Sequence, residues 1–227
     1  MIFKIHLQLD KFCVNNIFNF PLGCVNDVPG LPIIPIIERK YNVFFSGSLN
    51  NWRLLLYYYL LFGDIPCGVI RKGIRYFSNI DLTRRLLIKI TFDHKYPSSY
   101  IRFTNGFLRG LSAQVYGETI ADSKIVLCPK GFQFAECYRH YEAMRAGCII
   151  ISEKLPPTFF YKDSPIIQIS NWKEGLNIAR ELISDNTEME NRSKMTLEWW
   201  EKRCSENATA HYIVKCIGNI DKKKSYI

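Results

Sequence analysis

The sequence predicts an α/β fold, in which a parallel β-sheet carries helices on its faces. The strongest evidence lies in residues 123–151, where two apolar runs of strand length enclose a helical segment. The first run covers residues 125–127 and ends before Pro129, and the second begins at Cys148. Two short strands joined by one helix form a βαβ unit, whose crossover makes the strands parallel. Composition agrees, since hydrophobic residues make up 48% of the 227-residue chain, enough for a sizeable core.

The connecting segment predicts a helix over residues 136–146 that follows a glycine-bearing loop. Gly147 stands where helices commonly end, and Gly131 gives the loop a free choice of backbone angle. The crossover brings the helix N-terminus to the carboxyl edge of the sheet. Unpaired N–H groups and a partial positive charge at that terminus favour a diphosphate ligand.

Polar residues on this helix indicate what it binds. Arg139 and Glu142 are three residues apart and therefore lie on neighbouring rows of one helix side. We expect Arg139 to clamp phosphate oxygens, Lys130 to add a point charge, and Glu142 to accept hydrogen bonds from two ribose hydroxyls. The alternative is an ordinary intrahelical ion pair on a solvated face, which contributes only about 0.3–0.5 kcal/mol.

A second basic group is expected upstream. Residues 43–45 read as a buried first strand, and residues 46–48 as the tight turn that leaves it. Asn50 or Asn51 caps the helix that follows. Arg53 then falls in the first helical turn, where a cation is unfavourable unless an anion binds beside it. The alternative for Arg53 is a solvated surface arginine.

Together these residues resemble the donor-binding, C-terminal half of the exostosin-type glycosyltransferases. That family carries Cys-Pro-Arg/Lys-Gly, then an Arg three residues before Glu-Ala-Leu/Met, then Ala-Gly-Cys-Ile. The corresponding stretches here are residues 128–131, 139–144 and 146–149. The resemblance extends over roughly residues 17–185, and it is looser around Arg102 and Arg109, which are secondary candidates for sugar or phosphate contacts.

The resemblance implies the C-terminal domain of a two-domain GT-B glycosyltransferase, with a Rossmann-like parallel sheet flanked by helices. It implies transfer of a sugar from a UDP-sugar to a glycan or lipid-linked glycan acceptor, in surface polysaccharide synthesis. Neither a cofactor nor a bound metal is expected, because the chain has no Asp-x-Asp and its cationic residues can stabilise the leaving diphosphate. The expected nucleotide-sugar-binding residues are Ser46, Gly47, Arg53, Lys130, Gly131, Arg139 and Glu142.

The same resemblance divides the chain. Residues 1–40 are expected to hold an N-terminal strand and linker, a remnant of the acceptor domain; residues 41–185 form the donor-binding domain; and residues 186–227 form C-terminal helices that pack on it. Helical patterns in the C-terminal third of the chain cover about residues 172–184, 188–203 and 207–217, the first of them capped by Asn171. The resemblance places the general base in the missing acceptor domain, so no catalytic residue is assigned and a separate acceptor-domain subunit is an expected partner.

The formal net charge of +9 indicates an anionic partner. A nucleotide sugar, an acidic glycan or a membrane surface fits this charge. Nucleic acid fits it too, but the basic residues are dispersed apart from residues 222–224, and no nucleic-acid-binding signature is present. Two alternatives to an active transferase stay open. The first is a catalytically silent nucleotide-sugar-binding subunit or truncated remnant, and the second is a basic nucleic-acid-binding protein.

Cysteine and histidine usage predicts a reducing compartment and no zinc site. The eight cysteines contain no Cys-x-x-Cys pair and read as small core residues, and the four histidines are scattered. We expect His140 to serve in packing. The apolar residues 54–62 are far shorter than the ~20 needed to cross a bilayer and read as a buried helix. With no secretory segment visible either, we expect a cytoplasmic protein, with peripheral membrane association as an alternative.

Overall fold

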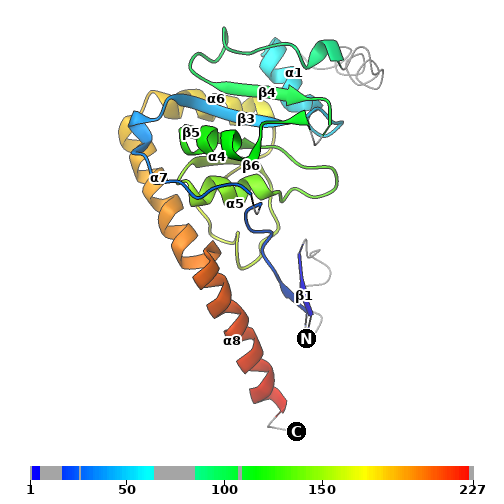
Figure 1. The fold of residues 1–227 in the computed structure, drawn as a ribbon, viewed down its shortest axis with the longest axis vertical. Coiled ribbons are helices and arrows are strands. Elements are labelled where there is room, and N and C mark those ends of the chain that lie inside the picture. The colour runs from blue at the N-terminus through cyan, green and yellow to red at the C-terminus, as the bar shows by residue number, and fades with distance from the viewer. Residues whose placement is uncertain (1, 6–16, 26, 64–84, 107–108, 225–227) are drawn as a thin grey trace.

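The structure is a computed structural model that describes residues 2–5, 17–25, 27–63, 85–106 and 109–224. Its centre is a five-stranded parallel sheet with the strand order β4-β3-β5-β6-β7 (Figure 1). The predicted α/β, Rossmann-like fold is therefore confirmed. The strands are β3 (Tyr41–Ser48), β4 (Tyr100–Thr104), β5 (Ser123–Cys128), β6 (Ile149–Glu153) and β7 (Ile167–Ile169).

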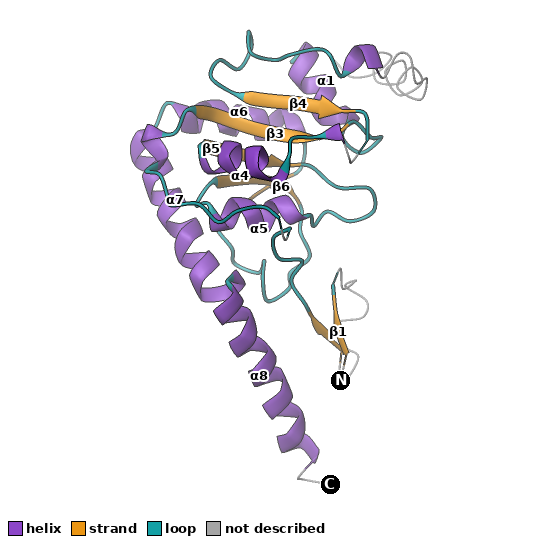
Figure 2. Ribbon diagram, in the orientation of Figure 1, coloured by secondary structure: helices purple, strands orange, loops and turns teal. Residues whose placement is uncertain are grey.

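Helices cover both faces of this sheet. They are α1 (Leu54–Phe62), α4 (Ala113–Ala121), α5 (Tyr138–Arg145), α6 (Trp172–Ile183), α7 (Asn186–Trp199) and α8 (Glu206–Lys224), with a π-helical segment, Trp200–Cys204, between the last two. In Figure 2, α4 and α5 lie in front of the sheet and α6 lies behind it, while α7 and α8 follow one another diagonally and α8 projects beyond the sheet.

Side chains alternate along β5 between two hydrophobic cores. Ile125 and Leu127 pack with residues of α1 and α6 on one face of the sheet. Val126 and Cys128 pack with residues of α5 on the other face. Because both faces are covered, a central parallel strand reads as a continuous apolar run, and this is the pattern that the sequence shows at residues 125–127.

The direction in which strands are added reverses between β3 and β5. From β3 the chain passes through α1 to β4 on one side, and from β4 it passes through α4 to β5 on the other side. In an open parallel sheet such a switch point leaves a crevice outside the carboxyl ends of the two strands, where ligands bind. Here β3 ends at Ser48 and β5 ends at Cys128. The loops that follow these two residues therefore flank the expected ligand position.

The turn predicted at residues 46–48 is wrong. These residues belong to β3, because they pair in register with residues 102–104 of β4. Pairing with a neighbouring strand overrides the weak strand preference of a Ser-Gly-Ser sequence. The chain turns instead at Asn50, whose Oδ1 accepts hydrogen bonds from the backbone N–H groups of Trp52 and Arg53 at 3.0 and 3.1 Å. Helix α1 then begins at Leu54, with Arg53 at its N-cap position.

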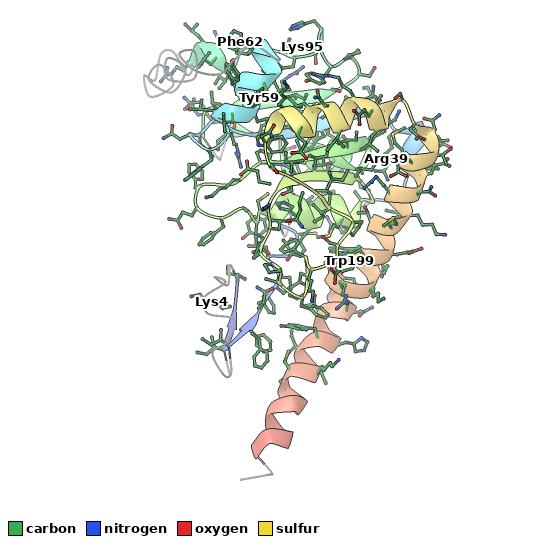
Figure 3. All side chains as sticks on the ribbon, turned by 180° about the vertical axis from the view of Figure 1, so that it is seen from behind. Lys4, Arg39, Tyr59, Phe62, Lys95 and Trp199 are labelled. Carbon is green, nitrogen blue, oxygen red and sulfur yellow. The ribbon has the colours of Figure 1, made fainter. Side chains whose placement is uncertain are left out.

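The C-terminal helices form close to where they are predicted. The Asn171 side chain accepts a 3.0 Å hydrogen bond from the Glu174 N–H and caps α6. Trp200 is buried in the core, and Trp199, labelled in Figure 3, donates its indole N–H to the Phe160 carbonyl at 3.0 Å. Among the described residues, no helix has both the length and the apolar character that crossing a membrane requires.

The N-terminal region reaches the sheet through a buried arginine. Strands β1 (Ile2–Lys4) and β2 (Ile17–Asn19) form a parallel pair of their own, and residues 6–16, like Cys67, lie outside the described residues. A short 3₁₀ helix, Ile36–Glu38, then leads to Arg39 (Figure 3). Its guanidinium donates to the carbonyls of Ile34, Ser123 and Ala146 at 3.0, 2.9 and 2.7 Å. The domain boundaries near residues 40 and 185 stay predictions.

Candidate functional site

Two buried arginines meet at the switch point. Arg53 stands at the start of α1 and Arg139 in the first turn of α5, and their relative exposures are only 7% and 8%. Both guanidinium groups lie against the backbone of Gly47. A Cβ atom at Gly47 would stand 2.9 Å from Arg53 Nη1 and 3.0 Å from Arg139 Nη2. Glycine is therefore favoured at this position by the close approach of two cations, and not by a turn.

Each arginine is held by backbone carbonyls. Arg53 Nη1 donates to the Ser48 carbonyl at 2.9 Å, and its Nε donates to the Lys130 carbonyl at 3.3 Å. Arg139 Nη2 donates to the Ser46 carbonyl. Both guanidinium groups also lie over the ring of Phe45, with Cζ-to-centroid distances of 5.7 Å for Arg53 and 4.9 Å for Arg139. Arg53 thus contacts both the end of β3 and the loop after β5, and Arg139 contacts β3.

The pair carries more positive charge and more donors than its surroundings satisfy. In the described structure Arg139 Nε and Nη1 are buried and have no hydrogen-bond partner. Burial, together with the charge of Arg139, lowers the pKa of Arg53 to about 10. Buried cations are stable only when they are paired and hydrogen-bonded, so we expect an anion to bind beside this arginine pair. The solvated alternatives for Arg53 and Arg139 are therefore wrong.

The loop after β5 contributes Lys130 and Gly131. Lys130 is half-buried, and its ammonium lies 3.8 Å from the ring centroid of Trp52, which is 52% exposed. The Gly131 N–H donates to the Phe134 carbonyl at 3.0 Å, which closes the loop on itself. The hydrogen bond from Arg53 to the Lys130 carbonyl ties this loop to the arginine pair.

Glu142 lies one turn deeper in α5 and is buried, with a relative exposure of 3%. Its Oε2 accepts a 2.8 Å hydrogen bond from the Tyr116 hydroxyl, and its Oε1 accepts a longer one, 3.4 Å, from the Val25 N–H. Burial raises the pKa of this carboxyl group, and the hydrogen bond from Tyr116 and the charge of Arg139 oppose that rise. Among the described residues no ion pair joins Arg139 to Glu142. The ribose contact stays a prediction.

Among the described residues, no contact joins Arg102 or Arg109 to the pair of Arg53 and Arg139. Arg102 forms an ion pair with Asp93 at 3.0 Å, in which both side chains are partly exposed, and its guanidinium also lies over the Tyr100 ring. Arg109 is exposed. Their role in donor contacts stays a prediction.

Sequence reasoning missed a cluster of two cysteines and a histidine next to this site. Cys128 ends β5, Cys137 is the N-cap of α5 and His140 lies in its first turn. Their potential metal-binding atoms all lie within 4.8 Å of one another. The pKa of the Cys137 thiol lies well below its usual range, because the Cys128 thiol donates a hydrogen bond to it and His140 is adjacent. The Cys-x-x-His spacing of residues 137–140 was the one signal available in the sequence.

Comparison with known families identifies part of this arrangement. Residues 109–217 match the family model described as RXYLT1 C-terminal domain. This range contains β5, its loop and α5, and it leaves β3 and Arg53 outside. No curated protein matches the chain. The resemblance read from the loop and helix motif is thereby confirmed: residues 109–217 are similar to a domain of an exostosin-related family of glycosyltransferases.

Proposed function

We propose that this chain binds a UDP-sugar at the β3–β5 switch point, as the donor-binding part of a glycosyltransferase that extends a glycan of a surface polysaccharide. The observation that carries the proposal is the buried pair of Arg53 and Arg139, with two unpartnered donor atoms on Arg139. It lies at the position where open parallel sheets bind nucleotides. The glycosyltransferase family of residues 109–217 makes a nucleotide-sugar diphosphate the fitting anion.

In this proposal the diphosphate lies across the two guanidinium groups at the N-terminal end of α5. Nε and Nη1 of Arg139 point in different directions from the planar guanidinium, so each offers a separate hydrogen bond to a phosphate oxygen. Arg53 shares the charge of the second phosphate, and Lys130 swings from the Trp52 ring to the outer oxygens. When the sugar leaves, charge develops on the nucleoside diphosphate, and these fixed cations stabilise it in a buried setting.

The nucleoside extends toward Glu142. This carboxylate lies on the helix side next to Arg139, one turn further along, and the long contact from the Val25 N–H is the weaker of its two hydrogen bonds. The two ribose hydroxyls replace that contact. The acceptor hydroxyl and the base that deprotonates it are supplied by an acceptor domain or a partner subunit.

Calorimetric titration with UDP, UDP-sugars and ADP tests the proposal. We expect saturable, uridine-selective binding that Arg139→Ala weakens by about 10- to 150-fold, the range that corresponds to one lost hydrogen bond between charged groups, about 1.5–3 kcal/mol. Arg192→Ala is the matched control, because Arg192 sits on α7 in a partly exposed ion pair with Glu188. Folded protein without UDP affinity, or an Arg139→Ala variant with unchanged affinity, would refute the proposal.

A further inference from the structure

We propose that Cys128, Cys137 and His140 form a zinc site that fastens both ends of the loop after β5. The two sulfur atoms and a ring nitrogen of His140 lie within 4.8 Å of one another, and Cys137 Sγ is 3.3 Å from His140 Nδ1. Cys128 and His140 are fully buried, and Cys137 is half-buried. Two thiolates and one imidazole are ligands that zinc prefers.

The spacing of these atoms is close to that of a tetrahedral site. With Zn–S near ~2.3 Å and Zn–N near ~2.0 Å, neighbouring ligand atoms around zinc are separated by roughly 3.5–3.8 Å. The separation between Cys137 Sγ and His140 Nδ1 is already within a few tenths of an ångström of that value. Since all three atoms lie within 4.8 Å of one another, closing the remaining gaps requires movements of no more than about 1 Å.

Ser152 offers the second ring nitrogen of His140 a hydrogen-bond partner. His140 Nε2 lies 2.8 Å from Ser152 Oγ. The Ser152 hydroxyl can donate its proton to the Glu153 carbonyl at 2.9 Å or to the Cys128 carbonyl at 3.3 Å, and its oxygen can then accept a hydrogen bond from His140. In the zinc-bound state Nε2 would carry the proton. The Nδ1 lone pair would bind the metal, and this nitrogen now lies 3.1 Å from the Cys137 N–H and 3.0 Å from the Cys137 carbonyl. Zinc-binding histidines characteristically donate their second ring N–H in this way.

Charge also favours zinc at this place. Two thiolates, a neutral imidazole and Zn²⁺ sum to zero, so the occupied site adds no net charge next to the buried arginine pair. Binding releases the thiol protons that the free cluster holds. The described residues supply three ligands, and in this proposal a water molecule takes the fourth position.

A metal at this site would hold the loop after β5 in place. Cys128 precedes the loop that contains Lys130 and Gly131, and Cys137 and His140 open the helix that carries Arg139. A metal bound to all three holds both ends of this loop at the edge of the sheet. The zinc site is independent of the proposed UDP binding, because its ligands are protein atoms alone.

Zinc binding by the full chain is measured by elemental analysis and by titration of chelator-treated protein, with a non-thiol reductant present. We expect one equivalent of zinc, and cobalt in its place should give an intense thiolate-to-metal absorption band. Cys128→Ser, Cys137→Ser and His140→Gln should each abolish stoichiometric binding, and Ser152→Ala should weaken it by about 10- to 100-fold. Cys204→Ser, at a buried cysteine outside the cluster, should leave it unchanged.

Cysteine alkylation of the parent chain keeps the test independent of variant folding. Zinc should protect Cys128 and Cys137 from a maleimide, and leave the labelling of half-buried Cys24 unchanged. Folded parent protein without bound zinc, or zinc that protects neither cysteine of the cluster, would overturn the site. No nucleotide enters these measurements, so a failure of UDP binding and a failure of zinc binding are distinguished directly.

Discussion

Gly47→Ala tests whether the convergence of two arginines on one backbone position sets donor affinity. The added Cβ would stand 2.9 Å from Arg53 Nη1, 3.0 Å from Arg139 Nη2 and 3.3 Å from the Phe45 ring. The first contact is too short to persist, and the second stands at the limit. Both guanidinium groups must therefore shift, and their hydrogen bonds to the carbonyls of Ser48 and Ser46 lengthen.

Two opposing terms set the expected loss of stability. Overpacking of a buried site costs about 1–3 kcal/mol, while replacing glycine by alanine in extended backbone recovers about 0.4–1 kcal/mol from the unfolded chain. The net destabilisation is about 0–2.5 kcal/mol, so the variant should fold. The affinity for UDP should decrease more than the stability does, because even one misplaced hydrogen bond between charged groups costs about 1.5–3 kcal/mol, or roughly 10- to 150-fold in Kd.

Urea denaturation and calorimetric titration with UDP measure the two effects on the same protein. Gly218→Ala on α8 is the matched control, since nothing lies within 4 Å of the added atom there. A folded Gly47→Ala variant whose UDP affinity stays within about twofold of the parent would refute the reasoning. So would complete unfolding, because the flexible ends of two arginines would then be more rigid than the structure indicates.

Three further predictions concern single side chains. Because burial raises the pKa of Glu142, the stability that this carboxyl group contributes at low pH is lost as the pH rises through its folded pKa. Glu142→Gln should therefore raise Tm more at pH ~8 than at pH ~5, and it should weaken UDP binding. A change in Tm that is independent of pH would contradict this reasoning. Arg139→Lys keeps the charge without the planar fork, so it should lower UDP affinity by roughly 10-fold, less than Arg139→Ala does, as calorimetry would show. Arg39→Leu leaves three carbonyls without their donor, so it should lower the free energy of unfolding by about 3 kcal/mol or more in urea denaturation without changing the UDP affinity of the folded protein.

Local signals predicted the parts of the fold that depend on neighbouring residues. The apolar run at residues 125–127, Gly147 after the crossover helix and the Asn171 cap all act within a few residues, and each occurs as expected. The extension of β3 through residues 46–48 depends on β4, which lies more than fifty residues further along the chain. No local pattern reports that pairing, so a Ser-Gly-Ser sequence reads as a turn.

The positions of the candidate residues could be predicted, but their burial could not. The sequence predicts that Arg53 and Arg139 bind an anion, a prediction that stays open, whereas their burial follows from the packing of two βα units against each other. The cluster of Cys128, Cys137 and His140 was missed for a related reason. A loop separates the first cysteine from the other two residues, and only the crossover geometry returns the start of α5 to the end of β5.

The two arginines link the βα units reciprocally. Arg139 comes from the helix after β5 and donates to Ser46 in β3, whereas Arg53 comes from the turn after β3 and donates to the Lys130 carbonyl after β5. Each unit therefore positions the cation of the other, and the spare donors are fixed before an anion arrives. Burial first, and then the charge of Arg139, lowers the pKa of Arg53, so holding both cations in the interior opposes folding. We expect a dianion at this position to relieve that repulsion, so that ligand binding would stabilise the switch point through thermodynamic linkage.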